Sequence, residues 1–130
     1  MLTYGPAERI LFLTMATRAE RNNRPNRESL KKRLGVKVVR AIDKRDGCRC
    51  FYCGATAATS GAPLQLDHLT PHSHGGADVA QNLVTACKRC NRARSNMTLV
   101  QWAAYAAEKF GLVIDPATVR KHARSIDLAA

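Results

Sequence analysis

Apolar residues recur at helical spacing in the first third of the chain. This pattern predicts helices over residues 6–21, 27–34 and 36–45, with Pro6 near a first helical position and a break around Pro25. The third stretch opens with Val-Lys-Val-Val, which would also suit a strand. The basic N-terminal part of the chain is therefore expected to be mainly helical.

The C-terminal part has two further helical patterns. Residues 99–110 are amphipathic at helical spacing, and Gly111 follows as a stop signal. Asp115 is a predicted N-cap and Pro116 a helix-starting proline. We therefore expect a last helix over residues 116–126.

Between these helical parts the pattern changes to short segments. Residues 64–68 read Leu-Gln-Leu-Asp-His, an apolar–polar alternation that suits a short strand. Residues 83–86 suit a returning strand, residues 89–96 a short polar helix, and Gly75-Gly76 a loop between the strands. These elements predict the α+β class, a mainly helical small domain around a short two-stranded core.

Charge is unevenly distributed along the 130 residues, a length that favours one compact domain. The formal net charge is +11. Residues 18–49 hold twelve Lys or Arg against four acidic residues, whereas residues 50–85 hold no Lys or Arg. We divide the chain into a basic helical part (1–45), a core (46–98) and C-terminal helices (99–130). The excess of positive charge favours a polyanionic partner, with sequence-independent phosphate contacts from residues 18–49.

Four of the five cysteines form two Cys-x-x-Cys pairs, Cys50 with Cys53 and Cys87 with Cys90. This spacing lets both sulfur atoms of a pair face one ion, and two pairs complete the tetrahedron of a structural zinc site. No signal peptide is apparent, so cysteines favour metal ligation over disulfides. Thirty-three residues separate the pairs, so another structure is inserted between the two halves of the site.

Cys48 lacks a partner at metal spacing and is expected to lie outside the zinc site. Its exchange with Cys50 as a ligand would spoil the Cys-x-x-Cys spacing but stays open as an alternative. Two unrelated cysteine pairs, or one redox-active pair, are further alternatives. A redox protein would lose zinc without unfolding, whereas four-cysteine zinc sites usually supply folding energy themselves.

The inserted segment contains the adjacent pair Asp67-His68. Phosphodiester hydrolysis needs a base for the attacking water and a divalent cation for the leaving oxygen. A neutral imidazole is a suitable base near pH 7, and carboxylate or amide oxygens suit magnesium or manganese. Because neighbouring strand residues point to opposite faces, one of these two side chains can hold the metal while the other faces the water.

These residues resemble the signature of the HNH endonucleases, a family with a ββα-metal fold. The matching positions, which span roughly residues 46–96, are Asp67-His68-Leu69-x-Pro71, Gly75-Gly76, Asn82-Leu83-Val84 and Cys87-x-x-Cys90-Asn91. The resemblance implies that DNA is cut to leave a 3′-hydroxyl and a 5′-phosphate.

The resemblance also implies a role for each of four residues. His68 would be the general base, and Asp67 a ligand of a catalytic Mg²⁺ or Mn²⁺. Asn82 would brace the loop and orient His68. Asn91 stands where many members have histidine, which makes this an H-N-N variant in which the amide oxygen of Asn91 supplies the second metal ligand.

Three of these residues also have a purely structural interpretation. Asp67 would then be a turn or capping carboxylate, and His68 a structural histidine with its hydrogen bonds satisfied. Asn91 would cap a helix that begins at Cys90, a role that does not exclude metal binding.

Other polar and aromatic residues near the signature have simpler expectations. His72 and His74 are expected to be solvated loop residues, and Trp102 is expected to pack in the core rather than stack on bases. A basic helix beside the site is a candidate for contact with the DNA backbone. Its residues are Arg89, Arg92 and Arg94.

Two functions of different classes remain open, a metal-dependent endonuclease and a non-catalytic zinc module that binds nucleic acid or a protein. Both explain the cysteines and the charge, but only the first explains the positions of Asp67, His68, Asn82 and Asn91. DNA is the expected partner, and no apolar run is long enough to span a bilayer. The expected location is the cytoplasm of a bacterial or phage-infected cell, with a monomer as one option for the oligomeric state.

Overall fold

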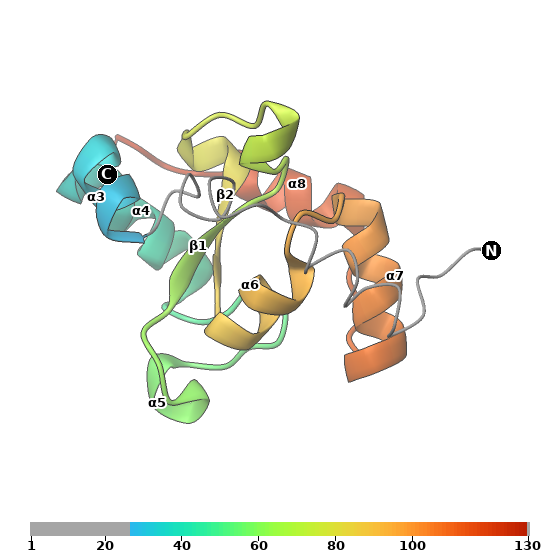
Figure 1. Cartoon of the computed structure of the whole chain (residues 1–130). Helices are drawn as coiled ribbons and strands as arrows, with labels where there is room; N and C mark the ends of the chain where they lie inside the picture. Colours follow the sequence, from blue (N-terminus) through green and yellow to red (C-terminus); the bar gives the residue numbers. More distant parts are fainter. Residues whose placement is uncertain (1–26, 130) are drawn as a thin grey trace.

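The computed structural model describes residues 27–129, and Figure 1 shows two central strands with helices on either side. The predicted helix over residues 6–21 lies outside the described residues. The elements in chain order are α3 (Arg27–Leu34), α4 (Val36–Asp46), α5 (Ala57–Ser60), β1 (Gln65–His68), the 3-10 turns η1 (His72–His74) and η2 (Ala80–Asn82), β2 (Leu83–Ala86), α6 (Lys88–Arg94), α7 (Leu99–Phe110) and α8 (Pro116–Arg124). The predicted α+β class is confirmed.

The N-terminal elements of the described part follow the apolar pattern. Residues 36–45 lie in helix α4 rather than in a strand, because Val39 and Ile42 are three residues apart and share one buried side of a helix. Gly47 ends α4 in the left-handed conformation. The short helix α5, which begins with a capping box at Thr56, was not predicted from the sequence.

Local signals also set the ends of the two C-terminal helices. Helix α7 begins at a capping box formed by Thr98 and Gln101, and it ends at Gly111, whose φ of 66° favours glycine. Helix α8 begins with Pro116 but ends at Arg124, two residues before the predicted end. Asp115 is the N-cap residue, as predicted, although its carboxylate accepts a hydrogen bond from the Thr118 hydroxyl and not from the backbone.

Strands β1 and β2 are antiparallel, and their register decides which side chains share a face. Asp67 lies opposite Val84, and His68 lies opposite Leu83. Paired residues point to the same face of the ladder, and neighbours along a strand point to opposite faces. Asp67 and His68 are therefore directed to different sides, as predicted.

The strand pair lies between two hydrophobic clusters. The smaller cluster includes Leu66 and Leu83 and lies against α3 and α4. The larger cluster includes Val84 and surrounds Trp102, which is fully buried. Trp102 thus packs in the core, as predicted. No helix among the described residues is long and apolar enough to cross a membrane.

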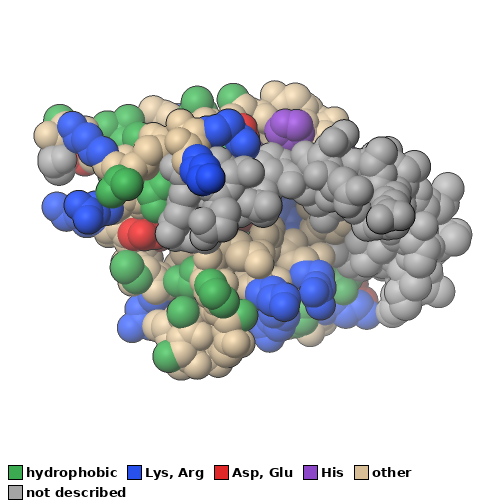
Figure 2. Space-filling model, turned by 60° about the vertical axis from the view of Figure 1, so that its left-hand side comes forward, with side chains coloured by type: hydrophobic (Ala, Val, Ile, Leu, Met, Phe, Trp, Pro, Cys, Tyr) green, Lys and Arg blue, Asp and Glu red, His purple; other side chains and the backbone are tan. Residues whose placement is uncertain are grey.

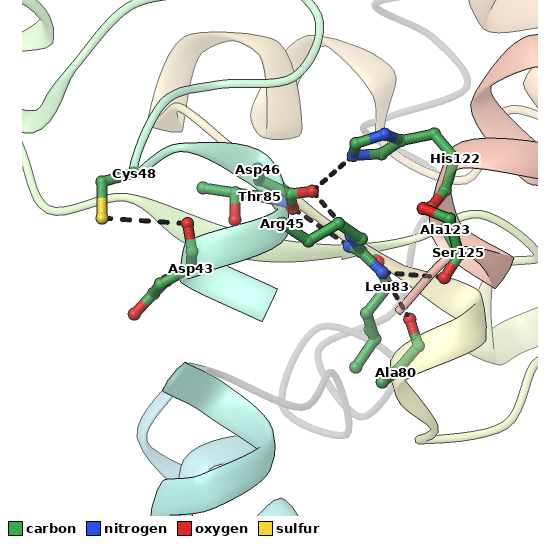
Figure 3. Close-up of polar contacts among 10 residues, drawn as sticks. All are labelled: Asp43, Arg45, Asp46, Cys48, Ala80, Leu83, Thr85, His122, Ala123 and Ser125. Atoms are coloured by element: carbon green, nitrogen blue, oxygen red, sulfur yellow. Dashed lines mark hydrogen bonds and ion pairs between the residues drawn. The ribbon is translucent and has the colours of Figure 1, made fainter. Parts of the chain in front are cut away.

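A buried polar cluster joins α8 to α4 and β2 (Figure 3). The Asp46 carboxylate, whose side chain has no exposed surface, accepts hydrogen bonds from Arg45, from the Thr85 amide and from His122 Nε2 at 2.6 Å. The Arg45 guanidinium also donates to three backbone carbonyls, those of Ala80, Leu83 and Ala123. Arg45 is therefore a structural residue within the basic stretch 18–49.

The Asp46 carboxylate is held in its charged form. Burial alone would raise the pKa of Asp46, but the hydrogen bonds from Arg45, Thr85 and His122 outweigh burial and hold it below its ordinary value. A carboxylate of this kind contributes stability above its unfolded-state pKa of about 3.9, and the contribution is lost as the pH falls through the folded-state pKa.

We expect Asp46→Asn to lower the free energy of unfolding by about 3 kcal/mol at pH 7, because Arg45 is left buried without its charged partner. The difference from the wild-type protein should shrink as the pH falls below about 3.9 and through the lower folded-state pKa, because the wild-type carboxylate then becomes protonated too. Urea unfolding at pH 7 and pH 3, followed by circular dichroism, measures both values. The control is Asp127→Asn at an exposed position, which should leave the free energy of unfolding unchanged at both pH values. An equal loss for Asp46→Asn at both pH values would contradict this assignment.

Candidate metal centre and catalytic site

The four cysteines of the two Cys-x-x-Cys pairs meet in one place. The sulfur atoms of Cys50, Cys53, Cys87 and Cys90 all lie within 4.8 Å of one another, and we call these residues the cysteine cluster. Cys50 and Cys53 lie in the turn after α4, whereas Cys87 caps the start of α6 and Cys90 lies in its first turn. The cluster can hold one metal ion, as the spacing predicts.

Backbone amides support two of these sulfur atoms as charged ligands. The Cys53 amide donates to Cys50 Sγ at 3.5 Å, and the Cys90 amide donates to Cys87 Sγ at 3.4 Å. The contact between Cys50 and Cys90 lowers the pKa of Cys50 to about 4 and raises the pKa of Cys90. Two thiolates this close repel each other, so a cation between the sulfur atoms would favour the charged form of both.

Cys48 lies outside the cysteine cluster, as predicted. Its thiol is exposed and faces the carbonyl of Asp43 at 3.9 Å (Figure 3). Cys50 instead is buried within the cluster, which excludes the exchange of these two residues in this structure.

Asp67 is buried on β1, with one of its oxygen atoms held by two donors. The Tyr52 hydroxyl donates to Asp67 Oδ2 at 2.6 Å, and Arg94 Nη1 donates to the same atom at 2.5 Å. Burial and the Asp67 charge raise the pKa of Tyr52 well above its ordinary value, so the hydroxyl keeps its proton. Among the described residues, Oδ1 of Asp67 has no such partner.

The position of Arg94 contradicts the prediction that this residue contacts the DNA backbone. Its side chain has no exposed surface, and besides Asp67 it donates to the carbonyl of Leu69. A guanidinium in this position does not reach a DNA phosphate. The reason is helical geometry, since two residues turn a helix by about 200° and point Arg94 away from the side that exposes Arg92.

His68 is held by a carboxylate that sequence reasoning missed. Its Nε2 lies 2.7 Å from Asp78 Oδ1, and Arg33 of α3 donates to the other oxygen of Asp78 at 3.0 Å. Burial raises the pKa of Asp78, but the hydrogen bond from His68 and the charge of Arg33 outweigh it and lower the pKa. The only sequence signal for Asp78 is a lone carboxylate ten residues after His68, in a segment without Lys or Arg.

Asn82 braces the loop between β1 and β2. Its Oδ1 accepts from the Thr70 amide at 2.9 Å, and its Nδ2 donates to the carbonyls of Thr70 and Ala77 at 3.1 Å and 3.0 Å. These hydrogen bonds of the Asn82 side chain go to the loop and not to His68. Asn82 holds the backbone two residues after His68, so any effect on the imidazole passes through the loop.

Asn91 lies inside α6 and faces β1. The helix begins at Lys88, with Cys87 as its N-cap, so the alternative that Asn91 caps the helix is wrong. Its Nδ2 donates to Gln65 Oε1 at 2.7 Å. With the nitrogen end of the amide held by Gln65, the Oδ1 end is the one available to a cation. Gln65 is a second positioning contact that the sequence did not reveal.

The remaining predicted residues lie at the surface. His72 and His74 are exposed in η1, as predicted for solvated loop residues. Arg92 is exposed, and Arg89 is exposed with its guanidinium carbon 4.3 Å from the centre of the Phe110 ring. Two of the three arginines proposed for DNA contact are therefore accessible.

Comparisons with known proteins concern the same part of the chain. Residues 48–97 match the family model of the HNH endonucleases. A stretch of 58 residues, 44% of this chain, is 43% identical to the CRISPR-associated endonuclease Cas9 of Actinomyces naeslundii. The matched stretch is 5% of the length of that relative. No solved structure matches the chain.

The loop braced by Asn82 depends on the missing side chain of Gly76. A Cβ atom there would lie 1.8 Å from the carbonyl oxygen of Thr70 and 2.9 Å from Asn82 Nδ2. We expect Gly76→Ala to lower the free energy of unfolding by about 3 kcal/mol, because the backbone must shift to admit the methyl group. Urea unfolding measures this loss.

The neighbouring Gly75 supplies the matched control. A Cβ at Gly75 meets nothing within 4 Å, although its φ of 83° is unfavourable for alanine. Gly75→Ala should therefore cost only about 1 kcal/mol. Equal losses for the two variants would show that the close approach to Thr70 is not what restricts position 76.

Proposed function

We propose that this chain is a metal-dependent endonuclease that hydrolyses DNA phosphodiester bonds, since residues 48–97 match the family model of the HNH endonucleases. The observation that carries the proposal is the arrangement of three side chains. His68, Asp67 and Asn91 are each held through one polar atom by a partner, and each keeps a second polar atom for chemistry. A structural role alone would not need that arrangement three times.

The proposed general base is Nδ1 of His68. The Asp78 carboxylate can only accept a hydrogen bond, so the Nε2 atom that faces it carries a proton. In the neutral imidazole the other nitrogen, Nδ1, is then the atom that accepts a proton from water. Asp78 also favours the charged imidazolium that forms when the proton is taken.

The proposed ligands of the catalytic cation are Oδ1 of Asp67 and Oδ1 of Asn91. A carboxylate and an amide oxygen are hard donors of the kind that Mg²⁺ and Mn²⁺ prefer. When bound, such a cation would stabilise negative charge on the leaving oxygen. The side chains orient these oxygens beforehand, through Tyr52 and Arg94 on one ligand and Gln65 on the other.

The proposed occupant of the cysteine cluster is a structural zinc ion. Zinc–sulfur distances of about 2.3 Å in a tetrahedron place the sulfur atoms about 3.8 Å apart. The 3.6 Å between the sulfur atoms of Cys53 and Cys87, and the 4.8 Å limit for the whole cluster, fit this size. Four thiolates leave no open position for a substrate, so this metal would serve the fold.

The proposed partner is DNA. The net charge of +11 attracts a polyanion, and Figure 2 shows Lys and Arg side chains spread over the visible face with few acidic ones among them. Arg92 and Arg89 are exposed on α6, the helix that also carries Asn91. We propose these two arginines, without Arg94, as contacts to the DNA backbone.

We expect the protein to cleave or nick plasmid DNA in the presence of Mg²⁺ or Mn²⁺, and we expect His68→Ala to slow cleavage about 10²- to 10⁴-fold. Loss of the imidazole removes the proton acceptor but leaves the cysteine cluster intact. Gel electrophoresis of plasmid over time measures the rate. The matched control is His74→Ala, an exposed histidine of the turn η1 that follows β1, which should cut at nearly the wild-type rate.

Two results would contradict this proposal. Wild-type protein that retains its bound zinc but never cuts DNA would favour the non-catalytic zinc module. Equal rates for the wild-type protein and His68→Ala would show that another group is the base.

We also expect one zinc ion per purified chain. Cys90→Ser should lose the zinc and most of its helical circular dichroism, because a structural site supplies folding energy. Cys48→Ser is the matched control, since its thiol is exposed and lies outside the cluster. Elemental analysis by mass spectrometry gives the metal content. Loss of zinc from both variants, or helical content unchanged in zinc-free Cys90→Ser, would contradict the structural site.

A further inference from the structure

The turn that carries the first two cysteines also carries a side chain that reaches the candidate catalytic carboxylate. Tyr52 lies between Cys50 and Cys53, and its side chain is buried. Its hydroxyl donates to Oδ2 of Asp67 at 2.6 Å. Its ring packs edge-on against Trp102, with 5.5 Å between the ring centres. The position of this hydroxyl is therefore tied to the position of the turn.

The second half of the cysteine cluster supplies a donor to the same oxygen. Cys87 and Cys90 lie at the start of α6, and Arg94 is the last residue of that helix. Arg94 Nη1 donates to Asp67 Oδ2 at 2.5 Å and to the Tyr52 hydroxyl at 3.2 Å. The segment around each half of the cluster thus supplies one hydrogen-bond donor, Tyr52 or Arg94, to Oδ2 of Asp67.

We propose that the cysteine cluster sets the affinity of the catalytic cation site, with Tyr52 and Arg94 as positioning residues that fix Asp67 through Oδ2 and present Oδ1 as its single ligand atom. This inference rests on the proposed function, which makes Asp67 a ligand. Zinc that closes the cluster holds the turn and α6 together, and so holds both donors against the carboxylate. The two metal sites are then coupled, and each metal binds more tightly when the other is present.

Tyr52→Phe tests the coupling because it removes one oxygen atom and keeps the ring in the core. We expect the dissociation constant for Mn²⁺ to rise at least about tenfold, as for other partners of metal ligands. Zinc content should stay at one per chain. Electron paramagnetic resonance of free Mn²⁺, with the zinc-loaded protein, measures binding without any substrate. Cleavage by Tyr52→Phe should recover at high Mn²⁺ concentration, which a defect in the base would not do.

Two controls accompany this variant. Tyr105→Phe is the matched control, because the Tyr105 ring packs against Trp102 and Phe110 in the same core. It should bind Mn²⁺ like the wild-type protein. Asp67→Asn identifies the site, since it should abolish the binding that Tyr52→Phe weakens.

The outcomes separate this inference from the proposed function. If the wild-type protein binds no Mn²⁺ that depends on Asp67, the catalytic site itself is wrong. If the wild-type protein binds Mn²⁺ through Asp67, but Tyr52→Phe binds it equally well with zinc in place, only the coupling is wrong.

A measurement on the wild-type side chain keeps the inference testable if Tyr52→Phe fails to fold. Protein labelled with ¹³C at the tyrosine ring carbon that bears the hydroxyl gives one resonance per tyrosine. Addition of Mg²⁺ should shift the Tyr52 resonance, because its acceptor becomes a metal ligand, and should leave that of Tyr105 in place. Mg²⁺ binding without a shift at Tyr52 would overturn the coupling.

Discussion

Closure of the turn at Cys50 and Cys53 against the start of α6 is the constraint on which the rest of the core depends. The strands between these points have four residues each, and a two-stranded hairpin of that size is marginally stable by itself. Bringing its flanks together costs loop-closure entropy. A metal held by the four thiolates would offset that cost with a few strong bonds, which a small core with few aromatic residues would find hard to match.

Two buried ion pairs then place the polar groups of this core. Arg45 with Asp46 joins α4, β2 and α8, and Arg94 with Asp67 joins α6 to β1. Burying such charges is costly, and the cost is tolerated only where further hydrogen bonds satisfy the groups. Both arginines also donate to backbone carbonyls, so each pair fixes backbone as well as side chains. As a result, one oxygen of the Asp67 carboxylate in the candidate site is restrained.

The local elements could be predicted because their signals lie within a few residues of one another. The apolar spacing of α4, the alternation in β1 and the terminal glycine of α7 each act on neighbouring backbone. The same holds for the two cysteine pairs, whose spacing already selects a metal. The contacts of the candidate site could not be predicted in this way, because their partners lie far apart in the sequence. Arg94 and Gln65 meet their partners 27 and 26 residues away in the chain, and only the packing of α6 on β1 brings them together.

By itself the sequence determined the α+β class, the short strands, the two cysteine pairs and the residues of the HNH signature, because these depend on residue type and spacing. The tertiary structure decided which charged residues are available. It buried Arg94 while leaving Arg92 exposed, joined His68 to Asp78, and turned one oxygen of Asp67 towards Tyr52. The physical reason is that a charge in the chain becomes a buried partner or a surface contact only through burial and neighbours, which no local pattern specifies.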